Sequence, residues 1–168
     1  MTVEACREEV AAFWRAYRAT LPAEQSAGLP DFPDAWGFGD GPAMADELGA
    51  LALAGVKTAT CSLLWEYEAE KEPMPEPGQF SVILDGAGRP LCLIETTEVR
   101  VLPYEQVDAR FAWDEGEGDR SLAFWRAEHW KYFSRYLADL GRQPAMDMPL
   151  VCERFRLVFT PADVPAGG

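Results

Sequence analysis

Lys57 is the first candidate for a chemical role. It lies between Gly55, at the end of an apolar helical pattern, and a group of three hydroxyl residues. A glycine just past a helix takes the left-handed conformation, so a tight turn aims the residues that follow. The hydroxyl residues are Thr58, Thr60 and Ser62, and their spacing of two puts them on one face of a strand, where they would hydrogen-bond a polar ligand. On position alone, such a lysine points to water and complements the helix dipole.

Glu115 and Glu117 are the second pair of candidates, because Gly116 and Gly118 alternate with them and would let the backbone approach a ligand. A loop carboxylate aimed toward Lys57 would supply the other half of an acid–base pair. A lysine with a pKa lowered by burial can act as a base or nucleophile, and as an ammonium it can neutralise an oxyanion or a phosphate. The structural alternative is an acidic loop that faces water.

Arg120 and Ser121 begin a predicted long helix, whose free backbone donors favour an anion. Otherwise Ser121 is only an N-terminal helix residue. The sole histidine, His129, lies on the apolar stripe of this helix between Trp125 and Phe133. We interpret it as a packed core histidine rather than a general base.

Five aromatic residues fall in predicted loops and are candidates for stacking on bases, namely Trp36, Phe38, Trp65, Tyr67 and Trp113. A stacked base contributes about 1–3 kcal/mol. Aromatic rings in loops either cover the core or bind a ligand in this way. Both readings stay open for Trp36, Trp65 and Trp113, which we count among the candidate substrate-binding residues.

The four cysteines, Cys6, Cys61, Cys92 and Cys152, are isolated in the sequence and form no C-x-x-C pair. They are typical of reduced packing residues in a cytosolic protein. For Cys61, which adjoins Lys57, packing is also the favoured role, since no base stands beside it in sequence. No set of ligands has the spacing of a metal site, so none is predicted.

The formal net charge of −13, from 15 Lys and Arg against 28 Asp and Glu, excludes broad attraction to duplex DNA. A short single strand or one nucleoside remains a suitable partner, because a local cleft can be positive or rich in stacking rings. The 168 residues are enough for one domain with its own core. We find no signal peptide and no apolar run of membrane-spanning length, so a cytoplasmic location is expected and no membrane partner.

Periodicity predicts long helices over residues 3–21, 42–55 and 120–140, with shorter helical segments within 63–78 and over 104–110. Thr2 and Asp119 are the expected caps of the first and last long helices, and Pro42 the first residue of the second. Strands are expected at residues 80–84, 91–99 and 150–159, the first two joined as a hairpin. Residues 22–41, rich in Pro and Gly, are predicted as a loop, and 161–168 as a loose tail.

The motif Gly55-Val56-Lys57-Thr58-Ala59-Thr60 resembles the signature of the ASCH family, small domains of the PUA-like superfamily. The resemblance covers residues 36–159 and extends to further segments in the right order: Phe38-Gly39-Asp40, the hairpin from Phe80 to Val101, the run from Phe111 to Leu122, and Val151-Cys152-Glu153-Arg154-Phe155. It is closest to the longer bacterial members. It implies an α+β fold with a small bent PUA-like β-barrel of about five or six strands and flanking helices. Residues 1–35 would then be a helix and loop packed on this domain, and 160–168 a tail.

The resemblance also implies three functions. The first is a ribonuclease for single-stranded RNA, in which Lys57 binds phosphate, Glu115 or Glu117 acts as base or holds a divalent ion (Mg²⁺ or Mn²⁺), and the aromatic rings stack on bases. The second is an amidohydrolase of an acylated nucleoside such as N4-acetylcytidine, with Lys57, Thr60 and Glu115 as catalytic residues. The third is a non-catalytic module that binds RNA or a modified base. A hydrolase is favoured, no cofactor is required, and the oligomeric state is left open.

Overall fold

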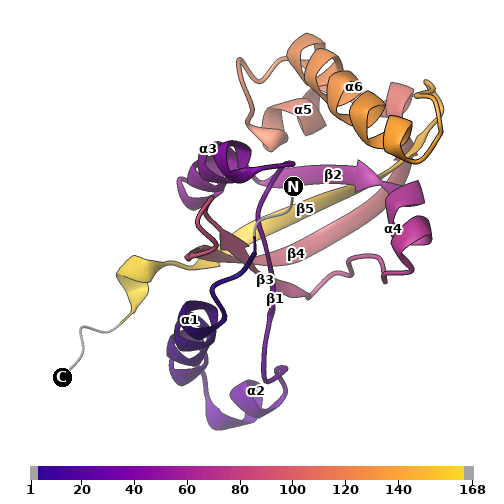
Figure 1. The fold of residues 1–168 in the computed structure, drawn as a ribbon. Helices are drawn as coiled ribbons and strands as arrows, with labels where there is room; N and C mark the ends of the chain where they lie inside the picture. Colours follow the sequence, from indigo (N-terminus) through magenta and orange to yellow (C-terminus); the bar gives the residue numbers. More distant parts are fainter. Residues whose placement is uncertain (1–3, 165–168) are drawn as a thin grey trace. The chain divides into compact units, whose positions relative to one another are not determined.

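The computed structural model describes residues 4–164, which form helices on a five-stranded sheet (Figure 1). The helices are α1 (Arg7–Ala19), α2 (Ala23–Ala27), α3 (Pro42–Leu53), α4 (Leu64–Glu70), α5 (Ala109–Glu115) and α6 (Leu122–Asp139). The strands are β1 (Asp34–Trp36), β2 (Ala59–Leu63), β3 (Phe80–Leu84), β4 (Pro90–Pro103) and β5 (Pro149–Phe159). The sheet has the order β1-β3-β4-β5-β2, which makes β2 an edge strand. The α+β class and the five strands confirm the predicted fold class.

The described chain divides into two compact units. The first unit consists of residues 4–55, 78–95 and 156–164, and the second of residues 56–77 and 96–155. The long strands β4 and β5 contribute to both.

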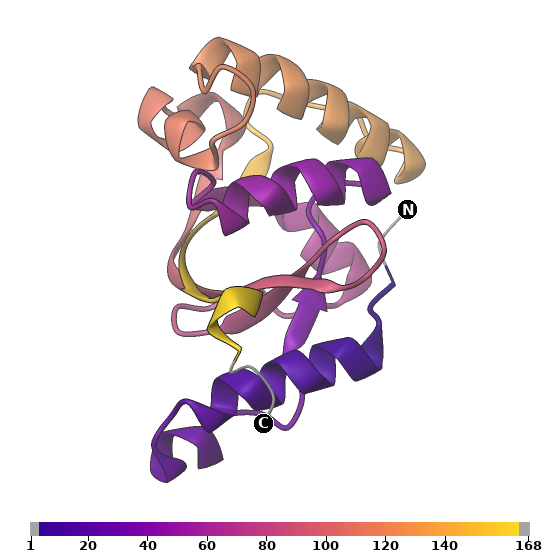
Figure 2. The same ribbon diagram turned by 90° about the vertical axis from the view of Figure 1, so that its left-hand side faces the viewer.

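The first unit is built on the β3–β4 hairpin, which is antiparallel as predicted, and β1 pairs with β3 in parallel. Helix α1 buries the stripe Val10, Phe13, Trp14 and Tyr17, and these pack with Val82, Leu84, Leu93 and Phe159. Helices α1 and α2 follow one another through a short turn (Figure 2). Helix α3 begins at Pro42 as expected, because proline suits a first helical position whose N–H has no partner.

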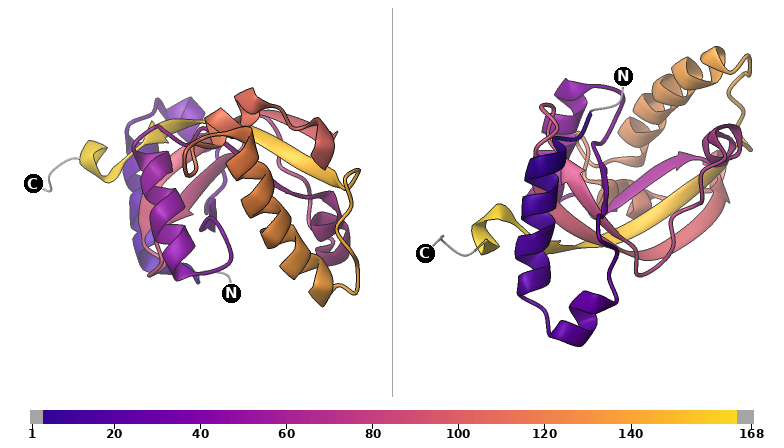
Figure 3. Two further views of the ribbon diagram at one scale, coloured as in Figure 1. Left: turned by 90° about the horizontal axis from the view of Figure 1, so that it is seen from above. Right: turned by 60° about the horizontal axis from the view of Figure 1, so that its bottom comes forward.

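The second unit holds β2, paired antiparallel with β5, and the helices α4, α5 and α6. Helices α5 and α6 lie beside each other (Figure 3). The core side chains come from β2, β5, both of these helices and the segment before α5: Ala59, Leu63, Tyr104, Val107, Phe111, Ala112, Trp125, Phe133, Leu137, Met148, Leu150 and Cys152. One face of β2 is therefore buried under α5 and α6.

Two predictions in the N-terminal part were wrong. Residues 22–41 are not a plain loop, because they contain α2 and β1. Both elements are short, and β1 forms through its pairing with β3, which local composition does not reveal. Helix α1 begins at Arg7 with Cys6 as its N-cap residue, and the predicted cap Thr2 lies outside the described residues.

Three predictions in the second unit were also wrong. Residues 104–110 form a 3₁₀ turn (Tyr104–Gln106) followed by the start of α5, whose cap Asp108 accepts a hydrogen bond from the N–H of Phe111 at 2.8 Å. Helix α5 thus extends to Glu115 through the predicted loop. Helix α6 is capped by Ser121, not Asp119, because the Ser121 hydroxyl accepts from Phe124 N at 3.0 Å while Asp119 accepts from Ser121 N.

The aromatic candidates, too, lie mostly in regular elements rather than loops: Trp36 in β1, Trp65 and Tyr67 in α4, and Trp113 in α5. At the C-terminal end, Pro161–Asp163 form a 3₁₀ turn, and residues 165–168 of the predicted tail lie outside the described part of the chain. Within residues 4–164, no helix has the length and apolar character needed to span a membrane.

Candidate functional site

Lys57 lies just before β2, and its side chain is 1% exposed. Helix α3 ends at Leu53, and Gly55 has φ 72°, which lets the chain turn toward β2. The N–H of Thr58 donates to the carbonyl of Asp114 at 2.7 Å, which fixes the start of β2 against the end of α5. The lysine is therefore held inside the second unit and does not point to water.

Two carboxylates surround the ammonium group of Lys57. Its Nζ lies 3.2 Å from Glu115 Oε2 and 2.8 Å from Glu117 Oε1, and it also donates to the carbonyl oxygen of Glu115 at 3.4 Å. Glu115 is 1% exposed and Glu117 is 16% exposed. Glu115 is also contacted by His129. The four residues Lys57, Glu115, Glu117 and His129 form what we call the Lys57 cluster.

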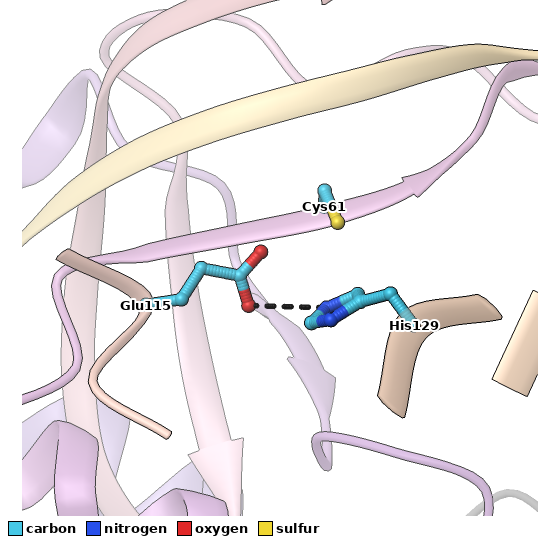
Figure 4. Close-up of side chains that lie close together, drawn as sticks. All are labelled: Cys61, Glu115 and His129. Atoms are coloured by element: carbon cyan, nitrogen blue, oxygen red, sulfur yellow. Dashed lines mark ion pairs between the residues drawn. The ribbon is translucent and has the colours of Figure 1, made fainter. Parts of the chain in front are cut away.

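His129 reaches the same carboxylate from α6. Its Nε2 lies 3.4 Å from Glu115 Oε2 (Figure 4). Its ring stacks on Trp125 with the ring centroids 4.2 Å apart. The indole N–H of Trp125 donates to Glu115 Oε1 at 3.1 Å. His129 Nδ1 lies 2.9 Å from the carbonyl oxygen of Trp125, which can only accept, so Nδ1 carries a proton. A hydrogen bond from Nε2 to the carboxylate then requires the imidazolium form.

The charges of the cluster depend on one another. Burial alone would lower the pKa of Lys57, but the carboxylates of Glu115 and Glu117 outweigh it and raise that pKa. Burial would raise the pKa of Glu115, but Lys57 and His129 hold it below its usual range. Burial opposes protonation of His129, and Glu115 overcomes this and raises the histidine pKa. Lys57 and His129 thus favour the carboxylate form of Glu115, and that carboxylate in turn favours their protonated forms.

Gly116 is what allows the turn after α5 to lie against Lys57. Its φ is 74°, and a Cβ atom there would lie 2.7 Å from the carbonyl oxygen of Val56 and 3.1 Å from Lys57 N. Only glycine fits such a close approach without displacing the backbone. The turn then carries Glu117 back to the ammonium group.

The ligand atoms of Cys61, Glu115 and His129 all lie within 4.8 Å of one another (Figure 4). Sulfur, carboxylate oxygen and imidazole nitrogen are all zinc donors. However, the oxygens of Glu115 already accept from Lys57, Trp125 and His129. Burial, with the Glu115 charge nearby, raises the pKa of the Cys61 thiol well above its usual value. These residues do not fit a metal ion, since the ammonium supplies the positive charge and the thiol keeps its proton.

The hydroxyl row does not join the Lys57 cluster. Thr58 Oγ1 donates to the carbonyl of Asp114 at 3.2 Å. Thr60 pairs with Glu153 across β2 and β5, and its side chain points to the face opposite Cys61. Ser62 Oγ on that same opposite face lies 2.9 Å from the hydroxyl of Tyr67. The structure therefore separates Thr60 and Ser62 from Lys57 and Glu115.

Glu153 gives the face of Thr60 its own character. Its Oε2 accepts from the hydroxyl of Thr96 at 2.6 Å, and burial raises its pKa. The Lys57 cluster therefore lies on one face of the β2–β5 pair. The buried carboxyl of Glu153 and the hydroxyl groups of Thr60 and Ser62 lie on the other face.

The candidate binding aromatics and Arg120 are dispersed. Trp36 lies in the first unit, where its ring packs edge-on against Phe38 with centroids 4.9 Å apart. Trp65 packs against the core of the second unit under the guanidinium of Arg142. Trp113 is 52% exposed, and the guanidinium of Arg120 lies 4.0 Å above its ring. Trp113 is thus the most accessible of the three tryptophans.

Arg120 and Ser121 have local structural roles. Arg120 has φ 64°, uncommon outside glycine, and its Nε donates to the carbonyl of Trp113 at 3.0 Å. Ser121 caps α6, which is the structural one of its two expected roles. Sequence reasoning missed His129 as a member of the cluster. The available signal was that Trp125 and His129 on one buried stripe both need polar partners.

Comparison with known proteins identifies the family of the chain. The family model of the ASCH domain matches residues 34–159, and the chain therefore belongs to the ASCH family, as the sequence motif indicated. A search of curated proteins found no match.

Two solved bacterial structures share the fold. The ASCH domain from Lactobacillus crispatus JV V101 is 36% identical, with a TM-score of 0.85 over 94% of this chain and 96% of that one. Protein EF3133 from Enterococcus faecalis V583 is 38% identical, with a TM-score of 0.80 over 91% of this chain and 90% of that one. The similarity spans nearly all of both chains, so the family assignment covers the second unit and its cluster.

Proposed function

We propose that the chain is a ribonuclease that cleaves single-stranded RNA through attack of a ribose 2′-hydroxyl on the adjacent phosphate. One observation carries the proposal: Glu115 Oε2 lies 3.2 Å from the ammonium of Lys57 and 3.4 Å from Nε2 of His129. A carboxylate, an imidazole and an ammonium around one point provide a base, an acid and a charge stabiliser for one phosphodiester.

Each group has a defined role in the reaction. Glu115 takes the proton of the 2′-hydroxyl while the 2′-oxygen forms a bond to phosphorus. The bond from phosphorus to the 5′-oxygen breaks, and His129 Nε2 gives its proton to that oxygen. The ammonium of Lys57 neutralises the charge that develops on the non-bridging oxygens. The products are a 2′,3′-cyclic phosphate and a free 5′-hydroxyl, and no co-reactant is consumed.

The ionisation of the cluster supports these roles. The lowered pKa of Glu115 and the raised pKa values of His129 and Lys57 favour the protonation states that these roles start from, a carboxylate, an imidazolium and an ammonium. An amidohydrolase that uses Lys57 as a neutral base is disfavoured by the raised lysine pKa. It is further disfavoured because Thr60 lies on the opposite face of β2. RNA cleavage therefore agrees better with the site than deacylation of N4-acetylcytidine.

Substrate access requires Glu117 to move. Its carboxylate, 16% exposed, occupies the side of Lys57 where a substrate phosphate would bind. Because the turn itself is closely packed at Gly116, this movement is a rotation of the partly exposed Glu117 side chain toward water. A phosphate that replaces the Glu117 carboxylate keeps the ammonium paired.

The exposed ring of Trp113 offers a stacking surface two residues before Glu115. Stacking on it would contribute about 1–3 kcal/mol for one base, independent of sequence. The guanidinium of Arg120 lies over one face of the ring, so a base would stack on the other face, with this positive charge close by. Because the net charge is −13, we expect few phosphate contacts and a shallow dependence of binding on salt.

The proposal is tested with a short single-stranded RNA and a copy that carries one 2′-deoxyribose at the cleavage site. Wild type should cleave the RNA with or without Mg²⁺ or Mn²⁺ and leave the deoxy position intact. Glu115→Gln should lower cleavage by about a hundredfold or more, since general base catalysis contributes that much.

The matched control is Glu128→Gln, because Glu128 is an exposed glutamate on α6 whose ion pair is with Lys131. It should cleave like wild type. Urea unfolding of each variant separates a folding defect from a catalytic one. Cleavage at the deoxy position, or full activity of folded Glu115→Gln, would refute the proposed mechanism.

A further inference from the structure

A second feature of the second unit is a pocket of 160 Å³, which does not include Lys57. Four of the residues that line it carry charged side chains: Glu98 and Arg100 from β4, Arg154 from β5, and Asp108 at the start of α5. Its volume is below the roughly 300 Å³ at which sites for drug-sized ligands begin. The size therefore suits one heterocyclic ring system rather than a whole nucleotide.

The floor of the pocket is apolar. Phe111, 6% exposed, and Cys152, 4% exposed, lie there. The guanidinium of Arg154 lies 5.4 Å from the centroid of the Phe111 ring. A flat ring that enters this pocket would contact aromatic and sulfur atoms below and meet polar groups around its edge, which is the arrangement that recognises a nucleobase.

The polar rim presents cations and carboxylates side by side. Glu98 pairs with Arg100 through one carboxylate oxygen and lies 3.7 Å from Arg154 Nε through the other. Arg154 also pairs with Asp114. The exposed fractions of the side chains are 37% for Glu98, 70% for Arg100 and 32% for Arg154, so a ligand can reach all three.

The pocket adjoins the Lys57 cluster within the same unit. Cys152 on its floor is the cross-strand partner of Cys61, whose sulfur lies near Glu115. Asp114, which pairs with Arg154, is the residue before Glu115. A base in the pocket would therefore lie close to the group that we assign as the catalytic base.

We propose that this pocket binds a guanine base of the RNA and selects the nucleotide at the cleavage site. Guanine presents two acceptors, O6 and N7, which arginine reads bidentately, and neighbouring N1–H and N2–H₂ donors that suit a carboxylate. Arg100 and Arg154 beside Glu98 provide both sets of partners when the base replaces the ion pairs that these side chains form with one another. Adenine has an amino donor where guanine has O6, and the pyrimidines lack N7. The inference rests on the proposed function for its RNA substrate class.

The test measures binding without cleavage, using free guanosine, adenosine, cytidine and uridine and following amide chemical shifts by NMR. Guanosine should bind most tightly and shift the signals of Phe111 and Gln106. Glu98→Gln should weaken guanosine binding by about tenfold, within the range for loss of one bidentate base contact. The control Glu105→Gln alters an exposed glutamate nearby that does not line the pocket and should bind like wild type.

The outcomes distinguish this inference from the proposed function. Guanosine binding in the pocket by a protein that cleaves no RNA would support the inference and refute the proposed ribonuclease activity. RNA cleavage with equal binding of all four nucleosides would overturn the inference and support the ribonuclease activity. Unchanged guanosine affinity in folded Glu98→Gln, or shifts confined to other residues, would also overturn the inference.

Discussion

Replacement of Lys57 by methionine removes the ammonium that two carboxylates share and keeps an unbranched side chain. In the native protein the Nζ lies 3.2 Å from Glu115 Oε2 and 2.8 Å from Glu117 Oε1. Glu117, 16% exposed, can turn toward water in the variant, whereas Glu115, 1% exposed, cannot. The variant therefore retains a buried carboxylate whose remaining cation is His129.

The expected loss of unfolding free energy follows from this burial. Removal of one partner from a buried ion pair costs about 3–5 kcal/mol, and we expect about 3 kcal/mol near pH 7 because His129 still pairs with Glu115. In wild type, the lowered pKa of Glu115 gives stability that is present above its unfolded pKa and lost as the pH falls. In the variant the pKa of Glu115 is higher, so the difference in unfolding free energy between wild type and variant decreases as the pH falls and Glu115 is protonated. Each unit by which the variant's pKa exceeds that of wild type contributes about 1.4 kcal/mol to this difference at neutral pH.

Urea unfolding near pH 7 and near pH 5 measures both quantities. The control is Lys131→Met on α6, because the Lys131 side chain is 63% exposed and pairs with Glu128 at the surface. It should cost less than about 0.5 kcal/mol at either pH. A buried ion pair between Lys57 and Glu115 is contradicted if Lys57→Met costs no more unfolding free energy than this control, or if its cost does not decrease as the pH is lowered.

Three other predictions follow from the same contacts. His129 is the single histidine, so NMR can follow its imidazole signal, and we expect it to titrate above its usual pKa. Because the pKa is raised in the folded state, the contribution of His129 to stability should be complete below its pKa in the unfolded chain. It should be lost as the pH rises through its pKa in the folded protein. A titration at or below the usual value would contradict the ion pair with Glu115. Gly116→Ala should destabilise the protein more than Gly141→Ala in thermal unfolding. Both glycines have positive φ, but of the two only Gly116 has backbone atoms where a Cβ would lie. The added cost should be about 1–3 kcal/mol, and equal costs for the two variants would contradict the close packing at Gly116. Ser121→Ala should cost about 1 kcal/mol through loss of the α6 cap in urea unfolding, and no measurable loss would argue against that cap.

The sequence predicts the elements whose pattern is local. The hairpin of β3 and β4, the last strand and the start of α3 at Pro42 follow from alternation, turn residues and proline geometry, and the structure confirms them. Strand β1 was missed because three residues carry no periodicity and its stability comes from pairing with β3. Helix α5 was shifted because its cap, Asp108, is one of several acidic residues in that stretch, and only the formed hydrogen bond distinguishes it.

The candidate site was predictable only in part. Proximity of Lys57 to Glu115 and Glu117 was expected from the motif and the glycines, and the structure brings all three together. Thr60 is three residues from Lys57, and an odd separation along an extended segment points the two side chains to opposite faces. His129 was not found because an apolar stripe predicts packing equally well for a histidine that stacks on tryptophan and one that also binds a buried carboxylate.

We propose that the Lys57 cluster performs acid–base chemistry on a ribose 2′-hydroxyl. The test is mass spectrometry of the ends left on a single-stranded RNA that has been incubated with the protein in a metal chelator. We expect fragments with a 2′,3′-cyclic phosphate and a 5′-hydroxyl, formed by wild type and not by Glu115→Gln. Intact RNA, fragments with a 5′-phosphate, or release of acetate from N4-acetylcytidine with the RNA left whole would contradict it.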